Sequence, residues 1–145
     1  MKRVAVLLGC LLLLFTLPVS SYAFPPNWMA CTYSYFDQGV SRRIPYMSGG
    51  VGEQERLCLA PMEKDYNLKM VFALDSKEYL ANETVTIHDM KGREIFQDRV
   101  TGPWLFVKLP SGDYKVTVSR EDHKSETRNV KVGNAMRTEY FKWKS

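Results

Sequence analysis

The sequence predicts an all-β protein, a seven-stranded antiparallel β-sandwich that follows an irregular arm and a short α-helix. Apolar and polar residues alternate with period two in short runs after residue 65, and Gly or Pro separates most of these runs. The connections are too short for the crossover helices that parallel strands need, so we expect antiparallel pairing. The 145 residues, 45% of them hydrophobic and 25% charged, suit one domain with a buried core.

Residues 1–23 are predicted to be a signal peptide that is removed on export. Two basic residues precede a nearly unbroken apolar run over 4–17, and the small residues Ser21 and Ala23 form a cleavage site. The run is shorter than the roughly 20 apolar residues that span a membrane, which argues against a retained anchor. We therefore expect a mature chain that begins at Phe24, is periplasmic or secreted, and has no stable membrane insertion.

The three cysteines fit this export prediction. Cys10 follows a short lipoprotein-like motif, but the apolar run continues beyond it, so we interpret Cys10 as part of the signal peptide. Cys31 and Cys58 remain after cleavage, and an even pair in an oxidising compartment predicts a disulfide. A zinc site would need more ligands, and His88 and His123 are far away in the sequence.

Charge and motifs exclude several classes of function. Loss of Lys2 and Arg3 with the signal peptide lowers the formal charge from +4 to +2, and no basic stripe remains to bind nucleic acid. The sequence has no G-x-S-x-G or H-E-x-x-H motif. We interpret His88 as a surface residue of a strand and His123 as part of a polar turn. We therefore expect no catalytic residue, no metal and no cofactor.

The N-terminal part of the mature chain is predicted to be an arm, a loop and a helix. Residues 24–47 are rich in aromatics and Pro without a sustained period of 2 or 3.6, which predicts an irregular arm that packs on the domain or meets a partner. Residues 48–65 begin with a flexible Gly-rich loop, and good helix formers follow from Glu53. Pro61 is expected to stop or kink this helix.

The same Gly-rich loop allows a second interpretation, a cradle for phosphate at the start of the helix. It lacks the G-K-[ST] ending of a P-loop, and Glu53 and Glu55 would repel a phosphate. The loop is therefore better explained as a flexible lead into the helix.

Residues 66–145 are predicted to form the sandwich domain. Seven runs have strand character, and they cover residues 66–73, 84–88, 94–100, 104–109, 114–119, 127–132 and 138–143. Alternation places Phe106, Tyr114 and Phe141 in the core. Pro110 and Gly112 belong to a type I turn that we expect to set the register of the strand after it.

Two motifs carry a resemblance to a known family. Leu109-Pro110-Ser111-Gly112-Asp113-Tyr114-Lys115-Val116 resembles the L-P-x-G-x-Y-x-V signature of carboxypeptidase regulatory-like domains, and residues 85–92 resemble their V-x-I-x-D-x-x-G hairpin. The segments 48–52, 66–68 and 102–103 resemble the sequences of small exported proteobacterial proteins that carry this domain. The resemblance spans residues 48–143 and implies a prealbumin-like (transthyretin-like) sandwich. It implies no particular function, because the fold hosts many roles.

Aromatic residues are the candidate ligand contacts. Tyr79 lies in the loop between the first two predicted strands, Trp104 starts a strand and Trp143 ends the last one. Exposed aromatics on a sandwich can stack on sugar rings or anchor a protein partner. The simpler interpretation is that Trp104 and Trp143 fill the two ends of the core.

The leading hypothesis is an exported, non-catalytic binding or structural module that presents sandwich loops and the aromatic arm to a protein or glycan of the cell envelope. An envelope accessory protein or inhibitor of a hydrolase is the alternative. A small transthyretin-like enzyme that hydrolyses a purine-derived ring comes third, because it would need a convergent His, Arg and Ser set that two scattered histidines do not suggest.

Overall fold

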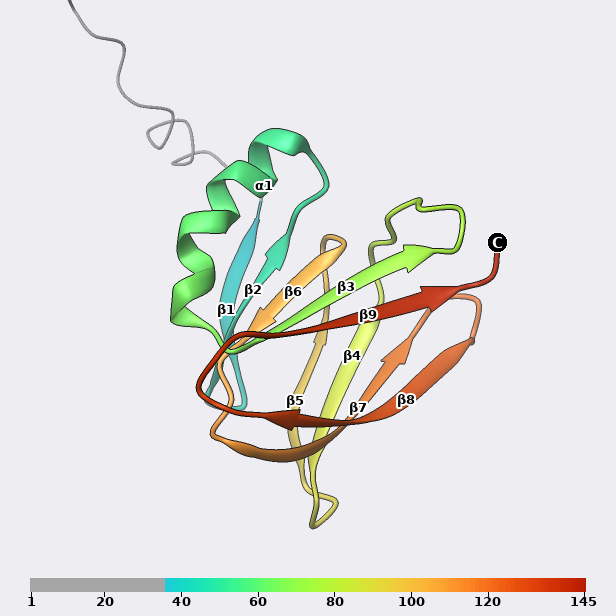
Figure 1. Ribbon diagram of the computed structural model, residues 1–145. Helices are drawn as coiled ribbons and strands as arrows, with labels where there is room; N and C mark the ends of the chain where they lie inside the picture. Colours follow the sequence, from blue (N-terminus) through green and yellow to red (C-terminus); the bar gives the residue numbers. More distant parts are fainter. Residues whose placement is uncertain (1–35) are drawn as a thin grey trace, which may run out of the picture.

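Two β-sheets packed face to face form the protein, as seen in a computed structural model that describes residues 36–145 (Figure 1). One sheet has the strand order β1-β2-β6-β3-β9, and the other has the order β5-β4-β7-β8. The strands are β1 (Asp37–Ser41), β2 (Ile44–Gly49), β3 (Leu68–Leu74), β4 (Thr84–Asp89), β5 (Glu94–Arg99), β6 (Trp104–Val107), β7 (Gly112–Ser119), β8 (Ser125–Val132) and β9 (Arg137–Trp143). The predicted sandwich is confirmed, with nine strands in the described residues rather than seven. The predicted signal peptide and Cys31 lie outside those residues.

Strands β3 to β9 coincide with the seven predicted runs, and the two additional strands come from the predicted arm. The prediction of an irregular arm over residues 24–47 is wrong for its described part, because β1 and β2 form an antiparallel hairpin there. Strand β2 is covered on both faces, so four successive residues are buried and no alternation marks it as a strand. The predicted Gly-rich loop begins inside this strand, since Ser48 and Gly49 pair with β6.

One strand pair is parallel, which corrects the prediction of a purely antiparallel sandwich. Strand β3 pairs with β9 in parallel from Leu68↔Arg137 to Leu74↔Trp143. The need for a crossover applies to strands that are neighbours in sequence. Here all of the chain from β4 to β8 makes the connection, so short individual loops do not prevent parallel pairing.

The main core lies between the two sheets. Leu68, Met70 and Phe72 of β3 point into it together with Phe141 of β9, and all four are fully buried. A smaller cluster of Met47, Leu59 and Phe106 lies on the other side of the five-stranded sheet. Phe106 is therefore buried as predicted, but on the outer face.

The predicted helix covers this smaller cluster. Helix α1 (Glu53–Leu59) continues directly into a 3₁₀ helix (Ala60–Asp65), so the α-helix stops just before Pro61, as predicted. The first turn is held by side chains, because the Val51 amide donates a 3.1 Å hydrogen bond to Glu55 Oε2. The two helices lie over the β1–β2 side of the sheet and leave the β3–β9 side open (Figure 1).

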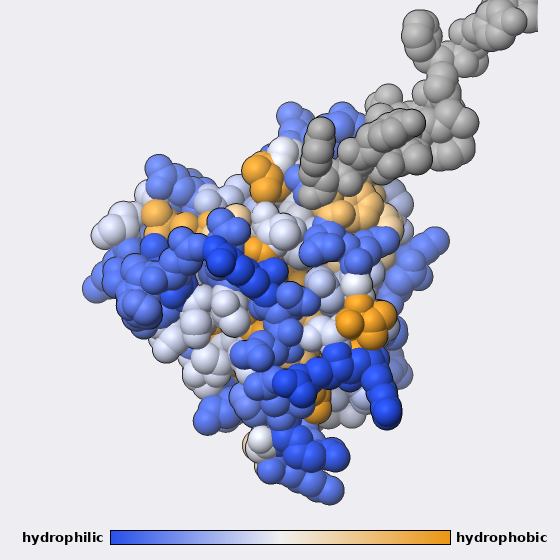
Figure 2. Space-filling view, turned by 180° about the vertical axis from the view of Figure 1, so that it is seen from behind, coloured by the Kyte–Doolittle hydropathy of each residue, from blue (hydrophilic) through white to orange (hydrophobic). Residues whose placement is uncertain are grey.

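Large exposed hydrophobic side chains are few and scattered. On the face shown in Figure 2, hydrophobic residues form separate small patches among hydrophilic ones. Those of the described residues with the largest exposed fractions are Val40, Val51, Leu57, Tyr79, Met90 and Tyr140. A broad apolar interface is therefore not visible on this face, and single aromatic side chains are better candidates for recognition. No helix among residues 36–145 is both long and apolar enough to cross a membrane.

Candidate functional site

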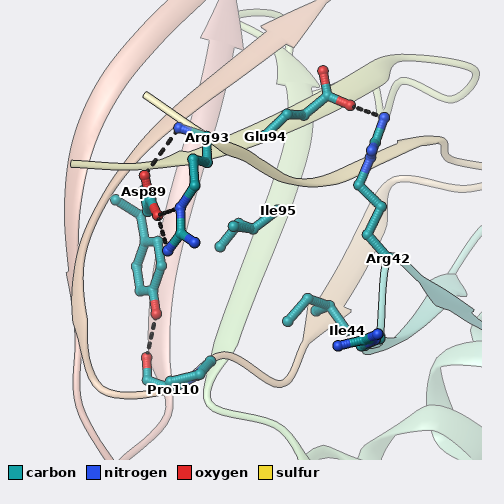
Figure 3. A pocket seen from close by; sticks show the side chains of 9 residues that line it. Arg42, Ile44, Asp89, Arg93, Glu94, Ile95 and Pro110 are labelled. Atoms are coloured by element: carbon teal, nitrogen blue, oxygen red, sulfur yellow. Dashed lines mark hydrogen bonds and ion pairs between the residues drawn. The ribbon is translucent and has the colours of Figure 1, made fainter. Parts of the chain in front are cut away.

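One hollow of the described surface lies where three turns meet at one end of the sandwich. It measures about 550 Å³ and is bordered by the β1–β2, β4–β5 and β6–β7 connections (Figure 3). Charged residues line it, namely Arg42, Arg43, Asp89, Arg93 and Glu94. Four of these side chains neutralise one another, because Arg42 pairs with Glu94 at 2.6 Å and Arg93 pairs with Asp89 at 2.7 Å.

Asp89 uses its carboxylate to organise the β4–β5 turn. Its Oδ1 accepts hydrogen bonds from the amides of Lys91 and Arg93 at 2.9 and 3.0 Å, and Arg93 Nε donates to Oδ2 at 2.7 Å. The Arg93 backbone N–H, together with its side chain, holds the pKa of Asp89 below its usual range. This carboxylate is committed to the turn, so we interpret the hollow as a junction of structural turns rather than as the binding site.

The predicted structural turn borders the same junction. The Tyr114 hydroxyl donates a 2.7 Å hydrogen bond to the Pro110 carbonyl, which ties the turn to the strand that follows it. Gly112 is the first residue of β7, and a Cβ atom added there would lie 3.6 Å from the Tyr114 hydroxyl, an ordinary contact. Hydrogen bonds such as the one to the Pro110 carbonyl hold this turn, and space at Gly112 is not what the turn depends on.

The three candidate aromatic residues are not brought together. Trp143 is only 8% exposed and stacks on Phe141 in the main core. Trp104 lies on the outer face of the five-stranded sheet, where it is partly covered beside Phe106. Tyr79 is 52% exposed. Trp143 is therefore placed as a core residue, whereas Tyr79 and Trp104 share the outer surface.

Arg56 of α1 links Tyr79 to Trp104. Its guanidinium lies 5.6 Å from the centroid of the Tyr79 ring and 5.9 Å from that of Trp104. The Gly50 carbonyl accepts a 2.8 Å hydrogen bond from Arg56 Nη1 and so fixes this side chain. Lys69 Nζ lies 3.8 Å from the Trp104 ring centroid. Two cations thus contact the Trp104 ring, and Arg56 brings the Tyr79 ring near it.

A groove continues from Tyr79 across the open part of the sheet. This outer groove measures about 370 Å³ and is lined by Val71, Ala73, Leu74, Asp75, Lys77, Tyr79, Tyr140 and Lys142. Val71 and Ala73 are apolar and nearly buried, whereas the Tyr79 and Tyr140 side chains are 52% and 55% exposed. Lys142 Nζ lies 5.9 Å from the Tyr140 ring centroid. The groove combines an apolar strand surface, two accessible rings and flanking charges, as ligand sites commonly do.

Sequence reasoning missed Tyr140. The signal for it was present, because Phe141 and Trp143 point into the core and strand alternation then turns Tyr140 outward. Its pairing with Val71 in the parallel β3–β9 ladder could not be predicted from the sequence, since that pairing joins distant parts of the chain.

The two histidines lie near opposite ends of the four-stranded sheet. His88 borders a shallow hollow on its outer face with Lys115, Thr117 and Thr127. His123 lies in the β7–β8 turn with a φ of 63°. Within residues 36–145, no group of three or more His, Cys, Asp or Glu side chains is arranged to hold a metal ion.

No family model matches this chain, and no curated protein matches it at a significant level.

Proposed function

We propose that this protein is an exported, non-catalytic binding module that holds a glycan of the cell envelope in the outer groove. The observation that carries the proposal is the pair of half-exposed tyrosine rings, Tyr79 and Tyr140, beside the apolar floor of Val71 and Ala73. The apolar face of a sugar ring can pack on an aromatic ring while the sugar hydroxyls stay available for polar partners.

The charged residues of the groove support a glycan over a purely apolar ligand. Asp75, Lys77 and Lys142 border the two rings and offer hydrogen-bond acceptors and donors to hydroxyl groups. The backbone around Tyr79 is also fixed, because it bridges to Ala73 and the next amide, Leu80 N, donates to Phe72 O at 3.0 Å. An ordered aromatic platform loses little conformational entropy on binding.

The prealbumin-like class of the sandwich is part of this proposal. It rests on the L-P-x-G-x-Y-x-V motif and agrees with the contact between Tyr114 and Pro110 in that turn. The predicted signal peptide over residues 1–23 supports an envelope location.

Binding of purified mature protein to soluble oligosaccharides and to isolated cell-wall polysaccharide tests the glycan proposal. Tyr79→Ala and Tyr140→Ala should each weaken binding by about tenfold, because each removes one stacking surface. Met90→Ala is the matched control, since Met90 is 64% exposed in the β4–β5 turn and lies outside the groove. Glycan binding that survives both tyrosine changes would contradict the proposal. Loss of a captured envelope protein in the same variants would instead identify a protein partner.

A further inference from the structure

A second, smaller pocket lies at the end of the sandwich that carries the C-terminus. The β3–β4 loop and the β7–β8 turn meet there (Figure 1), and Leu80, Ala81, Glu83, Arg120, Glu121 and Asp122 line a space of about 240 Å³. We call it the polar end pocket. Its first lining residue, Leu80, comes directly after Tyr79 in the sequence, but the chemistry of this pocket differs from that of the outer groove.

One buried hydrogen-bond acceptor and one buried hydrogen-bond donor line this pocket, and neither has a hydrogen-bond partner. Glu83 is 3% exposed and its Oε2 accepts no hydrogen bond, while the buried Arg120 Nη1 donates none. No ion pair joins these two side chains in the described part of the protein, although both border the same space. A buried donor or acceptor that has no partner loses its hydration without compensation, so the arrangement is unfavourable in the free protein.

The backbone of Glu83 and the side chain of Arg120 are held in place by other contacts. The backbone beside Glu83 is fixed to the chain after β5, because Val100 N donates to Glu83 O at 2.9 Å and Asn82 N donates to Val100 O at 3.0 Å. The Arg120 guanidinium lies 5.7 Å from the Trp143 ring centroid, and its Nη2 lies 3.5 Å from Asp122 Oδ2. The acceptor therefore lines the pocket from an ordered backbone, and the donor lines it from an anchored side chain.

The pairing of one acceptor with one donor selects a chemical class of ligand. A hydroxyl group accepts a hydrogen bond from Arg120 and donates one to Glu83 at the same time. An anionic ligand would be repelled by Glu83, and a cationic one by Arg120. Glu121 and Asp122 at the rim are already paired with Arg99 and Lys124, so they add little attraction for a cation.

We propose that the polar end pocket is a subsite for one neutral sugar residue, held through its hydroxyl groups by Glu83 and Arg120. The proposal rests on the proposed glycan-binding function, because it assigns a second contact to the same class of ligand. The pocket volume is several times the roughly 30 Å³ of one water molecule, so it has room for more than a single bridging water.

Nuclear magnetic resonance of the mature protein tests the subsite, with free glucose, galactose, mannose and N-acetylglucosamine as probes. At least one neutral sugar should shift the amide signals of residues 80–83 and 120–122 in a saturable way. Glucuronic acid and glucosamine, the charged counterparts, should bind about tenfold or more weakly. Shifts from none of the neutral sugars at these amides would overturn the proposal and identify a pocket filled by water only.

Substitutions separate a binding role from a structural one. Glu83→Leu should weaken sugar binding by about tenfold or more while thermal stability is unchanged or raised, because it removes a buried carboxyl group that lacks a full set of partners. Arg120→Lys keeps the charge but loses the fork, and it provides the same test if Glu83→Leu does not fold. Asp113→Asn is the control, since Asp113 is exposed at the other end of β7. Unchanged sugar affinity in a folded Glu83 or Arg120 variant would overturn the assignment.

The experiments can disprove either proposed site without disproving the other. Tyr79→Ala should weaken oligosaccharide binding in the groove by about tenfold but leave the monosaccharide shifts at residues 120–122. If those shifts persist while Tyr79→Ala and Tyr140→Ala do not affect oligosaccharide binding, the outer groove is wrong and the end pocket stands. If only the groove variants lose binding and no monosaccharide shifts appear, the end pocket is wrong.

Discussion

The Tyr114 hydroxyl donates a 2.7 Å hydrogen bond to the carbonyl of Pro110, four residues earlier in the chain. Tyr114 is 6% exposed and belongs to the main core, so its ring and its hydroxyl act together. The ring anchors β7 between the sheets, and the hydroxyl fixes the turn that leads into it. Tyr114 therefore helps to fix both the turn and the register of β7.

Tyr114→Phe should lower the free energy of unfolding by about 0.5–1.5 kcal/mol, the usual net value of one hydrogen bond. The ring and its packing are kept, so the fold should not change. Denaturant unfolding measures the loss, and Tyr140→Phe serves as a control because that hydroxyl is on an exposed side chain. Equal stability of Tyr114→Phe and the wild type would show that the turn does not depend on this bond.

Gly102 is required by a close approach of two backbones. A Cβ atom at this position would lie 2.6 Å from the Cα of Gly49, and neither backbone can move without disturbing the β2–β6 pairing. Gly102→Ala should therefore destabilise the protein by about 1–3 kcal/mol, as overpacking in a dense core does. Gly133→Ala is the matched control, because a Cβ atom there meets nothing within 4 Å. Similar unfolding midpoints for the two alanine variants would contradict this explanation.

The sequence predicts strands such as β3 from their apolar alternation and misses the β1–β2 hairpin, which has no such alternation. Leu68, Met70 and Phe72 alternate with outward residues, and β3 was predicted from this pattern. In β2, Tyr46 packs into the main core while Met47 lies under the helix, so the alternation disappears. Alternation therefore marks β3 as a strand but cannot mark β2, whose two faces are both covered.

The candidate site was predictable by residue type but not by arrangement. Tyr79 stands out as an aromatic residue in a loop, and it is exposed. Its approach to Trp104 depends on Arg56, which comes from a helix far earlier in the chain. Glu83 gave no signal in the sequence, because the burial of a carboxyl group depends on the loops and strands that close over it.

The β1–β2 turn holds two non-glycine residues in the left-handed region, Arg42 with φ 50° and Arg43 with φ 73°. Two-residue hairpin turns of this kind favour Asn-Gly, since a Cβ atom is unfavourable at positive φ. Arg43→Gly should raise the free energy of unfolding by about 1 kcal/mol. Arg43→Lys keeps both the charge and the backbone strain, and its unfolding midpoint should match that of the wild type. A lower midpoint for Arg43→Gly than for Arg43→Lys would show that the arginine side chain stabilises the turn.

Cys58 lies in α1 and is 3% exposed, and its predicted disulfide partner, Cys31, is outside the described residues. Thiol counting under denaturing conditions should find no free thiol in mature exported protein, because the predicted cleavage after Ala23 removes Cys10. Reduction should cost roughly 3–4 kcal/mol of stability on the chain-entropy model. The double variant Cys31→Ser, Cys58→Ser is the control and should show no response to reductant. Two free thiols in protein isolated from the envelope would refute the bridge.

Titration of Glu83 should make the folding stability of the protein depend on pH, and the direction of its pKa shift sets the direction of that dependence. Burial raises the pKa of this carboxyl above its usual value of 4.5, and the positive charge of Arg120 only partly opposes that effect. As the pH falls through the raised pKa, the native state takes up the proton before the unfolded state does. The contribution of Glu83 to stability therefore rises as the pH falls, and it is least favourable at neutral pH.

Glu83→Gln should consequently be more stable than the wild type at pH 7, and the difference should shrink as the pH approaches 4. Asp89 and Asp122 have lowered pKa values and act in the opposite direction, but both proteins contain them, so their effects cancel in the comparison. Denaturant unfolding of both proteins across this pH range measures the difference, and Asp113→Asn controls for the loss of one negative charge. A stability difference that stays constant with pH, or that grows on acidification, would show that burial does not govern the titration of Glu83.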